Sequence, residues 1–338
     1  MHCWQCSSPT GADKLSWVMA PVPSPGPGEA LVAIDAASVN FPDLLVVEGK
    51  YQWQPQPPFT PGAEFAGTVV GLGPGTTGIA IGDEVMTVGT TGGFATHACV
   101  RADKLKPVPQ GMSAIEASVL QVAYGTAYHG LMDRAALRAG ETVLVLGAAG
   151  GVGTAAIQVA KAAGARVIAA VSSDAKAIFC RRLGADLTIN YTVENLREAL
   201  RASTPAGPDV IFDPVGDAHA EPAFRSIAWR GRYLVIGFAG GQIPRLALNL
   251  VLLKGASVTG VFWGEFDARE PKASRELIAA LARGHAAGWL RPVIDHILPM
   301  NELPAAYAHL RSRSTQGKIV MTNSAPPASR VEGATATR

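Results

Sequence analysis

The middle of the chain, from about residue 122 to residue 264, alternates between short apolar runs and alanine-rich segments of helical periodicity. The apolar runs are continuous, as is typical of strands that are buried on both faces of a parallel sheet. Strands joined by crossover helices predict an α/β domain built on a doubly wound parallel sheet. The six expected strands are 142–147, 165–171, 186–190, 209–215, 231–237 and 256–263, and the expected helices are 151–163, 174–183, 193–202 and about 218–230.

The chain before residue 122 has a different pattern and predicts a β domain. Residues 28–39 alternate between apolar and polar positions, and short strands are expected at 82–89 and 94–100. Turns rich in glycine and proline separate these strands.

The segment after residue 264 begins with a charged amphipathic helix over 270–284. A strand at 294–300, a helix at about 301–312 and a strand at 317–322 are expected to follow. We therefore predict a β domain of residues 1–121 and 265–323, interrupted by an inserted α/β domain of residues 122–264. Residues 324–338 have little apolar content and are predicted to form a disordered tail.

The composition excludes several classes of partner. The net charge is +2 and the basic residues are scattered, so we expect no nucleic-acid partner and no anionic membrane surface. No apolar run is long enough to span a bilayer, and the N-terminus lacks the pattern of a signal peptide. A cytoplasmic location is therefore expected.

Four cysteines are present, at positions 3, 6, 99 and 180. Cys3 and Cys6 form one C-x-x-C pair, but a zinc ribbon needs a second pair, and a thioredoxin-type site needs the pair at a helix N-terminus. We interpret them as two thiols on a first strand, with no metal or redox role.

A glycine turn follows the first strand of the α/β segment and leads into a helix. Its spacing is Gly147-x-x-Gly150-x-x-Gly153, with Ala148 where the usual G-x-G-x-x-G pattern has its first glycine. The N–H groups at a helix N-terminus bind pyrophosphate if the backbone can come close. Gly150 would permit that approach, Gly153 would permit tight packing on the strand, and Gly147 would supply the turn. This context predicts a dinucleotide site.

The residues after the second strand indicate which dinucleotide is bound. Sites for NAD have an acidic residue about 20 positions after the turn, where this chain has Ser172 and Ser173. Hydroxyl groups do not repel a 2′-phosphate, and Lys176 lies one helical turn further on, although it could also be a solvated surface lysine. Asp174 argues against this interpretation, but it stands where a helix N-cap is expected. The pattern favours NADPH.

Several motifs, in the right order, resemble the medium-chain dehydrogenase/reductase superfamily, and in particular its zinc-free quinone oxidoreductases. They are "SVNFPDLL", "PFTPGAEFAGTVVGLG", "GDEV", "LGAAGGVGTAAIQVAKAAGA", "TINY" and "RSTQGKIV". The resemblance covers about residues 15 to 322. It implies a GroES-like β domain built from both ends of the chain, with an inserted Rossmann domain and the cofactor in the cleft between them.

The resemblance also implies site residues. In such relatives, residues placed like Lys176, Tyr191 and Arg313 surround the 2′-phosphate, and the position of Asn40 lies near the nicotinamide. The strand edge near Phe262 is paired across a homodimer in relatives, so Phe262 is expected to serve either a pocket or an interface. Further contacts with the cofactor are expected at Thr126, Gly151, Val152, Phe238 and Phe262.

Zinc-dependent members of the superfamily carry a cysteine where this chain has Asn40, and a histidine where it has Ala63. These residues cannot supply the thiolate and imidazole of a catalytic zinc site. The structural zinc site needs four closely spaced cysteines before residue 120, and the chain lacks them. No metal site is therefore predicted, and Glu64 is expected to be hydrogen-bonded in the floor of the cleft.

Without a Lewis acid, hydride addition to an activated acceptor is more plausible than oxidation of an alcohol. Asn40 and Tyr51 are the candidate donors to the developing oxyanion, although Tyr51 could simply pack in its loop. That loop, with Trp53 and Phe59, is interpreted as an aromatic wall of the acceptor pocket.

We predict an NADPH-dependent reductase of quinones or α,β-unsaturated carbonyls that acts as a homodimer on a small-molecule acceptor. Two alternatives stay open from the sequence. One is an enoyl-thioester (acyl-CoA) reductase. The other is a non-enzymatic NADPH-binding protein of the crystallin or trafficking type.

Overall fold

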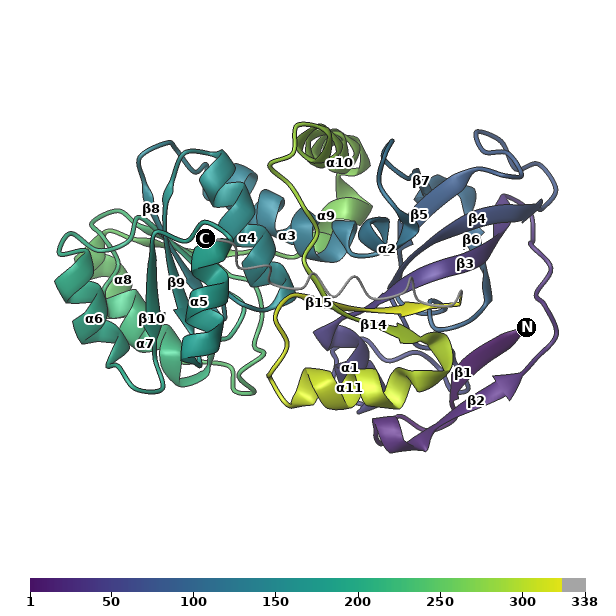
Figure 1. The fold of residues 1–338 in the computed structure, drawn as a ribbon, viewed down its shortest axis with the longest axis horizontal. Helices are drawn as coiled ribbons and strands as arrows, with labels where there is room; N and C mark the ends of the chain where they lie inside the picture. The colour runs from purple at the N-terminus through teal and green to yellow at the C-terminus, as the bar shows by residue number, and fades with distance from the viewer. Residues whose placement is uncertain (324–338) are drawn as a thin grey trace, which may run out of the picture.

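The structure, a computed structural model, describes residues 1–323, so the tail predicted at 324–338 lies outside the described residues. Two sheets lie in separate halves of the molecule (Figure 1). Residues from the middle of the chain, in teal and green, form one half. The two ends of the chain, in purple and yellow, meet in the other half. The predicted combination of an α/β domain inserted into a β domain is confirmed.

The α/β half contains a six-stranded sheet in the order β10-β9-β8-β11-β12-β13. Every neighbouring pair in it is parallel, and the order reverses between β8 and β11, as in a doubly wound sheet. The strands are β8 Thr142–Leu146, β9 Arg166–Val171, β10 Leu187–Asn190, β11 Val210–Asp213, β12 Arg232–Val235 and β13 Ser257–Gly260.

The parallel sheet is apolar on both faces, as its continuous hydrophobic runs predict. Successive residues of a strand point to opposite faces. Along β8, Val143 and Val145 belong to one buried cluster, whereas Leu144 and Leu146 belong to another. Because both faces of the sheet are buried, side chains that could contact a ligand lie at the ends of the strands.

The β half contains a seven-stranded sheet in the order β14-β15-β3-β4-β5-β7, with β6 also paired to β3. Strand β15 runs antiparallel to β3, so that Ile319 lies opposite Val39. The C-terminal strands therefore complete a sheet begun by the N-terminal ones, as a GroES-like domain requires. These strands are β3 Glu29–Val39, β4 Glu64–Leu72, β5 Glu84–Val88, β6 His97–Arg101, β7 Lys106–Pro107, β14 Ile294–Pro299 and β15 Lys318–Thr322; β1 His2–Cys6 and β2 Leu15–Met19 form a separate hairpin.

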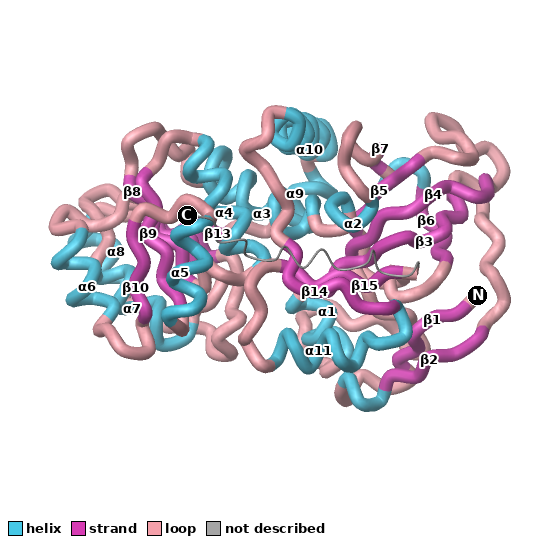
Figure 2. The backbone as a smooth tube through the Cα atoms, in the orientation of Figure 1, coloured by secondary structure: helices cyan, strands magenta, loops and turns pink. Residues whose placement is uncertain are grey.

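Helices surround the parallel sheet and fill the space between the two halves (Figure 2). The helices at residues 41–47, 114–134 and 248–254 were not predicted from the sequence, and a strand was expected where β13 ends and α9 begins. Segment 114–134 is apolar on nearly all sides and thus shows no amphipathic stripe. The helices are α1 Phe41–Val47, α2 Ala114–Ala117, α3 Thr126–Tyr128, α4 Gly151–Ala162, α5 Asp174–Arg182, α6 Leu196–Ser203, α7 Asp217–Arg225, α8 Leu248–Lys254, α9 Trp263–Arg269, α10 Pro271–Ala286 and α11 Leu303–Arg311, with π-helices η3 Leu120–Gly125 and η4 His129–Arg134 and 3-10 turns η1 Ala12–Lys14, η2 Ala102–Lys104 and η5 Met300–Glu302.

Helices α9 and α10 contact both halves. Trp263, Phe266, Leu277 and Leu281 belong to a buried cluster that contains strands of the parallel sheet and also Ala66 and Met86 of the β half. The boundary expected at residue 265 stays a prediction.

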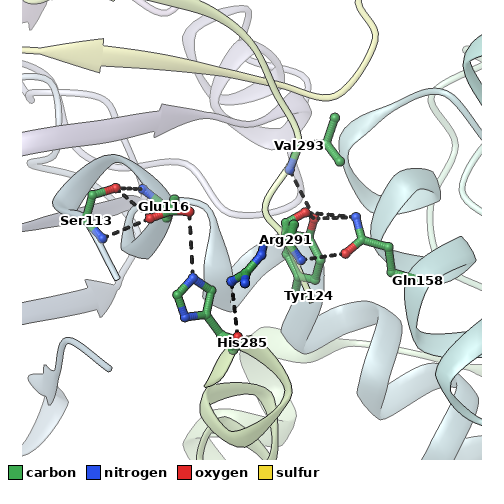
Figure 3. Close-up of polar contacts among 7 residues, drawn as sticks. All are labelled: Ser113, Glu116, Tyr124, Gln158, His285, Arg291 and Val293. Atoms are coloured by element: carbon green, nitrogen blue, oxygen red, sulfur yellow. Dashed lines mark hydrogen bonds and ion pairs between the residues drawn. The ribbon is translucent and has the colours of Figure 1, made fainter. Parts of the chain in front are cut away.

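The chain crosses between the halves through residues 287–293, and buried polar groups hold this crossing (Figure 3). The hydroxyl of Tyr124 accepts hydrogen bonds from Gln158 Nε2 (3.3 Å) and Val293 N (3.1 Å) and donates to Arg291 O (3.0 Å). Gln158 Oε1 accepts from Arg291 N at 2.8 Å, and Arg291 Nη1 donates to His285 O at 3.1 Å. These contacts fix the direction in which the chain enters β14.

Candidate cofactor and active site

The glycine turn between β8 and α4 has the backbone that its spacing predicts. Gly147 adopts φ +56°, in the left-handed region that favours glycine. A Cβ on Gly153 would lie 2.5 Å from Gly147 O and 2.7 Å from Ala148 Cα. Only glycine at position 153 therefore lets α4 pack this closely on the end of β8.

Gly150 has a different environment. It is the N-cap of α4, and a Cβ there would meet nothing nearer than Gly147 O at 3.4 Å. The N–H groups of Gly151, Val152 and Gly153 then open the helix, where backbone donors have no partner within the helix. The open space over Gly150 and these donors suit the approach of a pyrophosphate.

The remaining strands bring other predicted residues to the same edge of the sheet, since parallel strands end together. Ser172 and Ser173 follow β9, and Tyr191 follows β10. Phe238 follows β12 and is about one third exposed, whereas Phe262 follows β13 and is about half exposed. Both roles expected for Phe262, in a pocket or in an interface, stay predictions.

Four of the predicted phosphate-site residues converge from three distant segments. Lys176 Nζ donates to Ser172 Oγ at 3.3 Å and to the backbone oxygen of Arg313. Tyr191 lies close enough to Ser172 for this side chain to lower its pKa against the larger effect of burial, and Arg313 Nη2 donates to Gly240 O at 3.0 Å. Burial and the charge of Arg313 lower the pKa of Lys176. A bound phosphate would place negative charge beside Lys176 and Arg313 and would thus stabilise both cations.

The first turn of α5 corrects one expectation. Ser173, not Asp174, is the N-cap, because its side chain accepts a hydrogen bond from Lys176 N. The carboxylate of Asp174 accepts from Asn190 Nδ2 at 2.8 Å, at the end of β10. The acid that argued against a 2′-phosphate is thus engaged by the neighbouring strand.

Asn40 lies at the end of β3 in a buried polar network. Its Nδ2 donates to Ser38 Oγ at 3.0 Å and lies 3.4 Å from Glu64 Oε2, while Lys318 Nζ donates to its Oδ1. Glu64 also accepts from Ser38 Oγ (2.6 Å) and Val122 N (2.8 Å). The predicted hydrogen-bonded Glu64 is therefore found, whereas Lys318 was missed, because its only signal was a lysine opening an apolar strand.

Asp43 forms the second carboxyl group of this region. It accepts from Asn40 N at 2.8 Å and from Ala63 N at 3.0 Å. Burial raises its pKa to about 7, against the opposing effect of these hydrogen bonds and of Lys318. Glu64 likewise has a raised pKa, mainly because it is buried.

The other predicted residues are more dispersed. Thr126 is buried at the start of α3. Tyr51 is partly buried, which raises its pKa, and Asp43 raises it further. Trp53 is exposed, and Phe59 pairs with β1 and packs against the core of the β half. The role of Phe59 as a wall of the acceptor pocket stays a prediction.

Two further predictions concern metals and membranes. Cys3 and Cys6 lie buried on β1 as free thiols, the placement expected from the sequence. Among residues 1–323, no three side chains of His, Cys, Asp or Glu gather as the ligands of a metal ion would. No helix in this part of the chain combines the length and apolar character needed to cross a membrane.

Comparisons with known families agree with this architecture. The family model of the alcohol dehydrogenase GroES-like domain matches residues 26–110, and that of the zinc-binding dehydrogenases matches residues 151–282. The chain is 37% identical over 299 residues to quinone oxidoreductase-like protein 2 of Bos taurus, which covers 88% of this chain and 85% of the relative.

Solved structures show the same similarity. A probable oxidoreductase from Mycobacterium abscessus is 38% identical, with a TM-score of 0.85 over 95% of this chain and 98% of its own. The quinone oxidoreductase of Escherichia coli, solved as a complex with NADPH, is 27% identical, with a TM-score of 0.89 over 95% of this chain and all of its own. The chain therefore belongs to the quinone oxidoreductase branch of the medium-chain dehydrogenase/reductase superfamily.

Proposed function

We propose that this protein transfers a hydride from NADPH to a quinone or an α,β-unsaturated carbonyl, without a metal ion. The observation that carries the proposal is the convergence of Ser172, Lys176, Tyr191 and Arg313 beside the glycine turn. Two cations and two hydroxyl groups match the charge and hydrogen-bonding capacity of a 2′-phosphate. The Escherichia coli structure with NADPH supports the same cofactor.

The donor set near Asn40 supports hydride transfer without zinc. The amide of Asn40 is hydrogen-bonded at both ends, and Ala63 offers no side-chain ligand. Glu64 is engaged by Ser38 and Val122. Nothing in this arrangement resembles the thiolate and imidazole set of a catalytic zinc.

NADPH, when bound, would supply the hydride, and the chain would bind and orient the reactants. The glycine turn and the cluster around Lys176 would hold the phosphates, and Asn40 would orient the nicotinamide end. The hydroxyl of Tyr51, like that of any tyrosine with an ordinary or raised pKa, is protonated at neutral pH and can donate a hydrogen bond to the oxygen of an acceptor.

The activity is tested by following NADPH absorbance with the purified, chelator-treated protein and three acceptors: 1,4-benzoquinone, 2-cyclohexenone and crotonyl-CoA. We expect turnover with the quinone or the enone, and faster turnover with NADPH than with NADH. Preference for crotonyl-CoA would establish the enoyl-thioester alternative. Binding of NADPH without turnover of any acceptor would overturn the enzyme proposal, and loss of activity on chelation would overturn the metal-free part.

The cofactor assignment is tested by Lys176→Ala and Arg313→Ala. Each removes a charge-assisted hydrogen bond of about 1.5–3 kcal/mol, so NADPH should bind about tenfold more weakly or worse while NADH changes little. Lys161→Ala is the matched control, because Lys161 lies at the C-terminal end of α4 and pairs there with Asp186, away from the glycine turn. Equal losses for NADPH and NADH would contradict the assignment.

We also propose that the protein forms a homodimer through the edge of β13. This strand ends the strand order, so within residues 1–323 its outer edge has no partner strand. Leu248, Leu252 and Leu253 on the adjacent α8 are at least two-thirds exposed, and Val258 on β13 is also exposed. Light scattering should give twice the chain mass, and Val258→Lys should give a monomer. A wild-type monomer at micromolar concentration would exclude this assembly.

A further inference from the structure

Lys318, the first residue of β15, places an ammonium group in the interior, and no role described above uses it. The residue is only 6% exposed. Lysine is almost never buried to this extent unless its charge is paired or hydrogen-bonded. Its Nζ donates to Val39 O at 3.0 Å and to Asn40 Oδ1. Such a costly placement calls for a reason beyond packing.

The partners of Asn40 determine which way its amide group points. An ammonium group can only donate, so the amide oxygen must face Lys318. On the other side, Ser38 Oγ donates to Glu64 Oε2 at 2.6 Å and can therefore accept from Asn40 Nδ2 at 3.0 Å. Nδ2 thus has protein acceptors in Ser38 and Glu64, whereas Oδ1 accepts from Lys318 and lies on the side of the capping box at the start of α1.

Lys318 is itself held by the crossing between the two halves. Its backbone N donates to Val293 O at 2.9 Å, and Val293 N donates to the hydroxyl of Tyr124 (Figure 3). A Cβ on Gly151 would lie 2.4 Å from Lys318 Cδ, so the alkyl chain passes directly against the first residue of α4. The side chain thus extends from the glycine turn to Asn40.

We propose that Lys318 is a positioning residue for the nicotinamide end of the cofactor and that it acts through Asn40. Its ammonium group holds the Asn40 amide in one orientation, with the oxygen toward Lys318 and the amide nitrogen toward Ser38, and so fixes the side chain that would lie beside the carboxamide of a nicotinamide. The proposal rests on the NADPH-dependent function proposed above. The same orientation leaves no amide proton for an oxyanion, which argues against the donor role considered for Asn40 from the sequence.

The test compares NADPH with adenosine 2′,5′-bisphosphate, a probe that carries the 2′-phosphate but lacks the nicotinamide. Lys318→Met keeps an unbranched side chain, shorter by one atom, and removes the charge and the donors. We expect it to weaken NADPH about tenfold, the effect of one hydrogen bond to a charged group, and to leave the bisphosphate within about twofold. Intact bisphosphate binding also shows that the phosphate site is folded.

A double-mutant cycle separates this role from a general structural one. If Lys318 acts through Asn40, the variant Lys318→Met/Asn40→Ala should bind NADPH as Asn40→Ala does, because the second change removes nothing more. Additive losses in the cycle would contradict the proposal. NADPH deuterated at either C4 position gives another readout: a loosened carboxamide should let Lys318→Met transfer hydrogen from both faces of the ring.

Lys318→Gln, which keeps a donor on a neutral side chain, is the second variant if Lys318→Met does not fold. It should show the same selective loss of NADPH binding, smaller in size. Equal losses for NADPH and the bisphosphate, or no loss for either, would overturn the role of Lys318. Wild-type protein that binds neither probe would instead overturn the proposed NADPH function.

Discussion

Gly150 and Gly153 lie three residues apart in the same turn, yet alanine at each should have opposite consequences. At position 153 the new Cβ would fall 2.5 Å from Gly147 O and 2.7 Å from Ala148 Cα, both backbone atoms that cannot rotate away. At position 150 its nearest neighbour would be Gly147 O at 3.4 Å, an ordinary contact. The first change should damage the fold, and the second only the binding of pyrophosphate.

The magnitudes follow from these distances. Overpacking of this kind typically costs about 1–3 kcal/mol, and we place Gly153→Ala at the upper end, since α4 must move away from β8. Gly150 has φ −76° and ψ 170°, which alanine adopts without strain. The lower entropy of the unfolded chain adds about 0.4–1 kcal/mol of stability to Gly150→Ala, and the weaker N-cap removes a few tenths.

Calorimetry without cofactor and NADPH titrations measure the two effects. Gly153→Ala should lower Tm by several degrees, whereas Gly150→Ala should stay within about 2 °C of wild type. Gly150→Ala should nevertheless bind NADPH at least about tenfold more weakly, because the methyl group occupies the approach to the helix N-terminus. Wild-type NADPH affinity in Gly150→Ala would refute the assignment of this turn to pyrophosphate. An unchanged Tm in Gly153→Ala would refute the packing argument.

Three further changes test the framework around the site. Burial raises the pKa of Asp43 from 3.8 to about 7, so the folded chain keeps a proton that the unfolded chain releases. The free energy of unfolding should therefore fall as pH rises from about 4 to 7. Urea titrations at several pH values should show a weaker dependence of this free energy on pH in Asp43→Asn. Tyr124→Phe leaves the buried Val293 N–H without its acceptor and should lower the urea-derived stability by about 1–3 kcal/mol, and no change would contradict the role of this crossing. Arg232 donates two parallel hydrogen bonds to Glu141, at 2.9 and 2.6 Å, and Arg232→Lys leaves at most one of them. The variant should lower Tm by an amount equivalent to about 1 kcal/mol. A Tm equal to that of wild type would show that the Arg232–Glu141 pair contributes nothing to stability.

The sequence by itself determined the features that depend on neighbouring residues. Continuous apolar runs predicted strands buried on both faces, and the glycine spacing predicted a turn with a left-handed residue at Gly147 and no room for a Cβ at Gly153. Ser172 and Lys176 could be placed together because they lie four positions apart at the start of one helix. The absence of an acidic residue after β9 could also be recognised from the sequence, because that position is counted along the chain from the glycine turn.

Only the tertiary structure decided which distant residues meet. Arg313 reaches Lys176 across 137 positions, and Lys318 reaches Asn40 across 278. Both contacts depend on the crossing at 287–293 and on the return of β15 to β3, which no local periodicity encodes. Burial then changes the chemistry of ordinary side chains: an amide that can point either way in water is held in one orientation by a lysine that sequence reasoning would place in solvent.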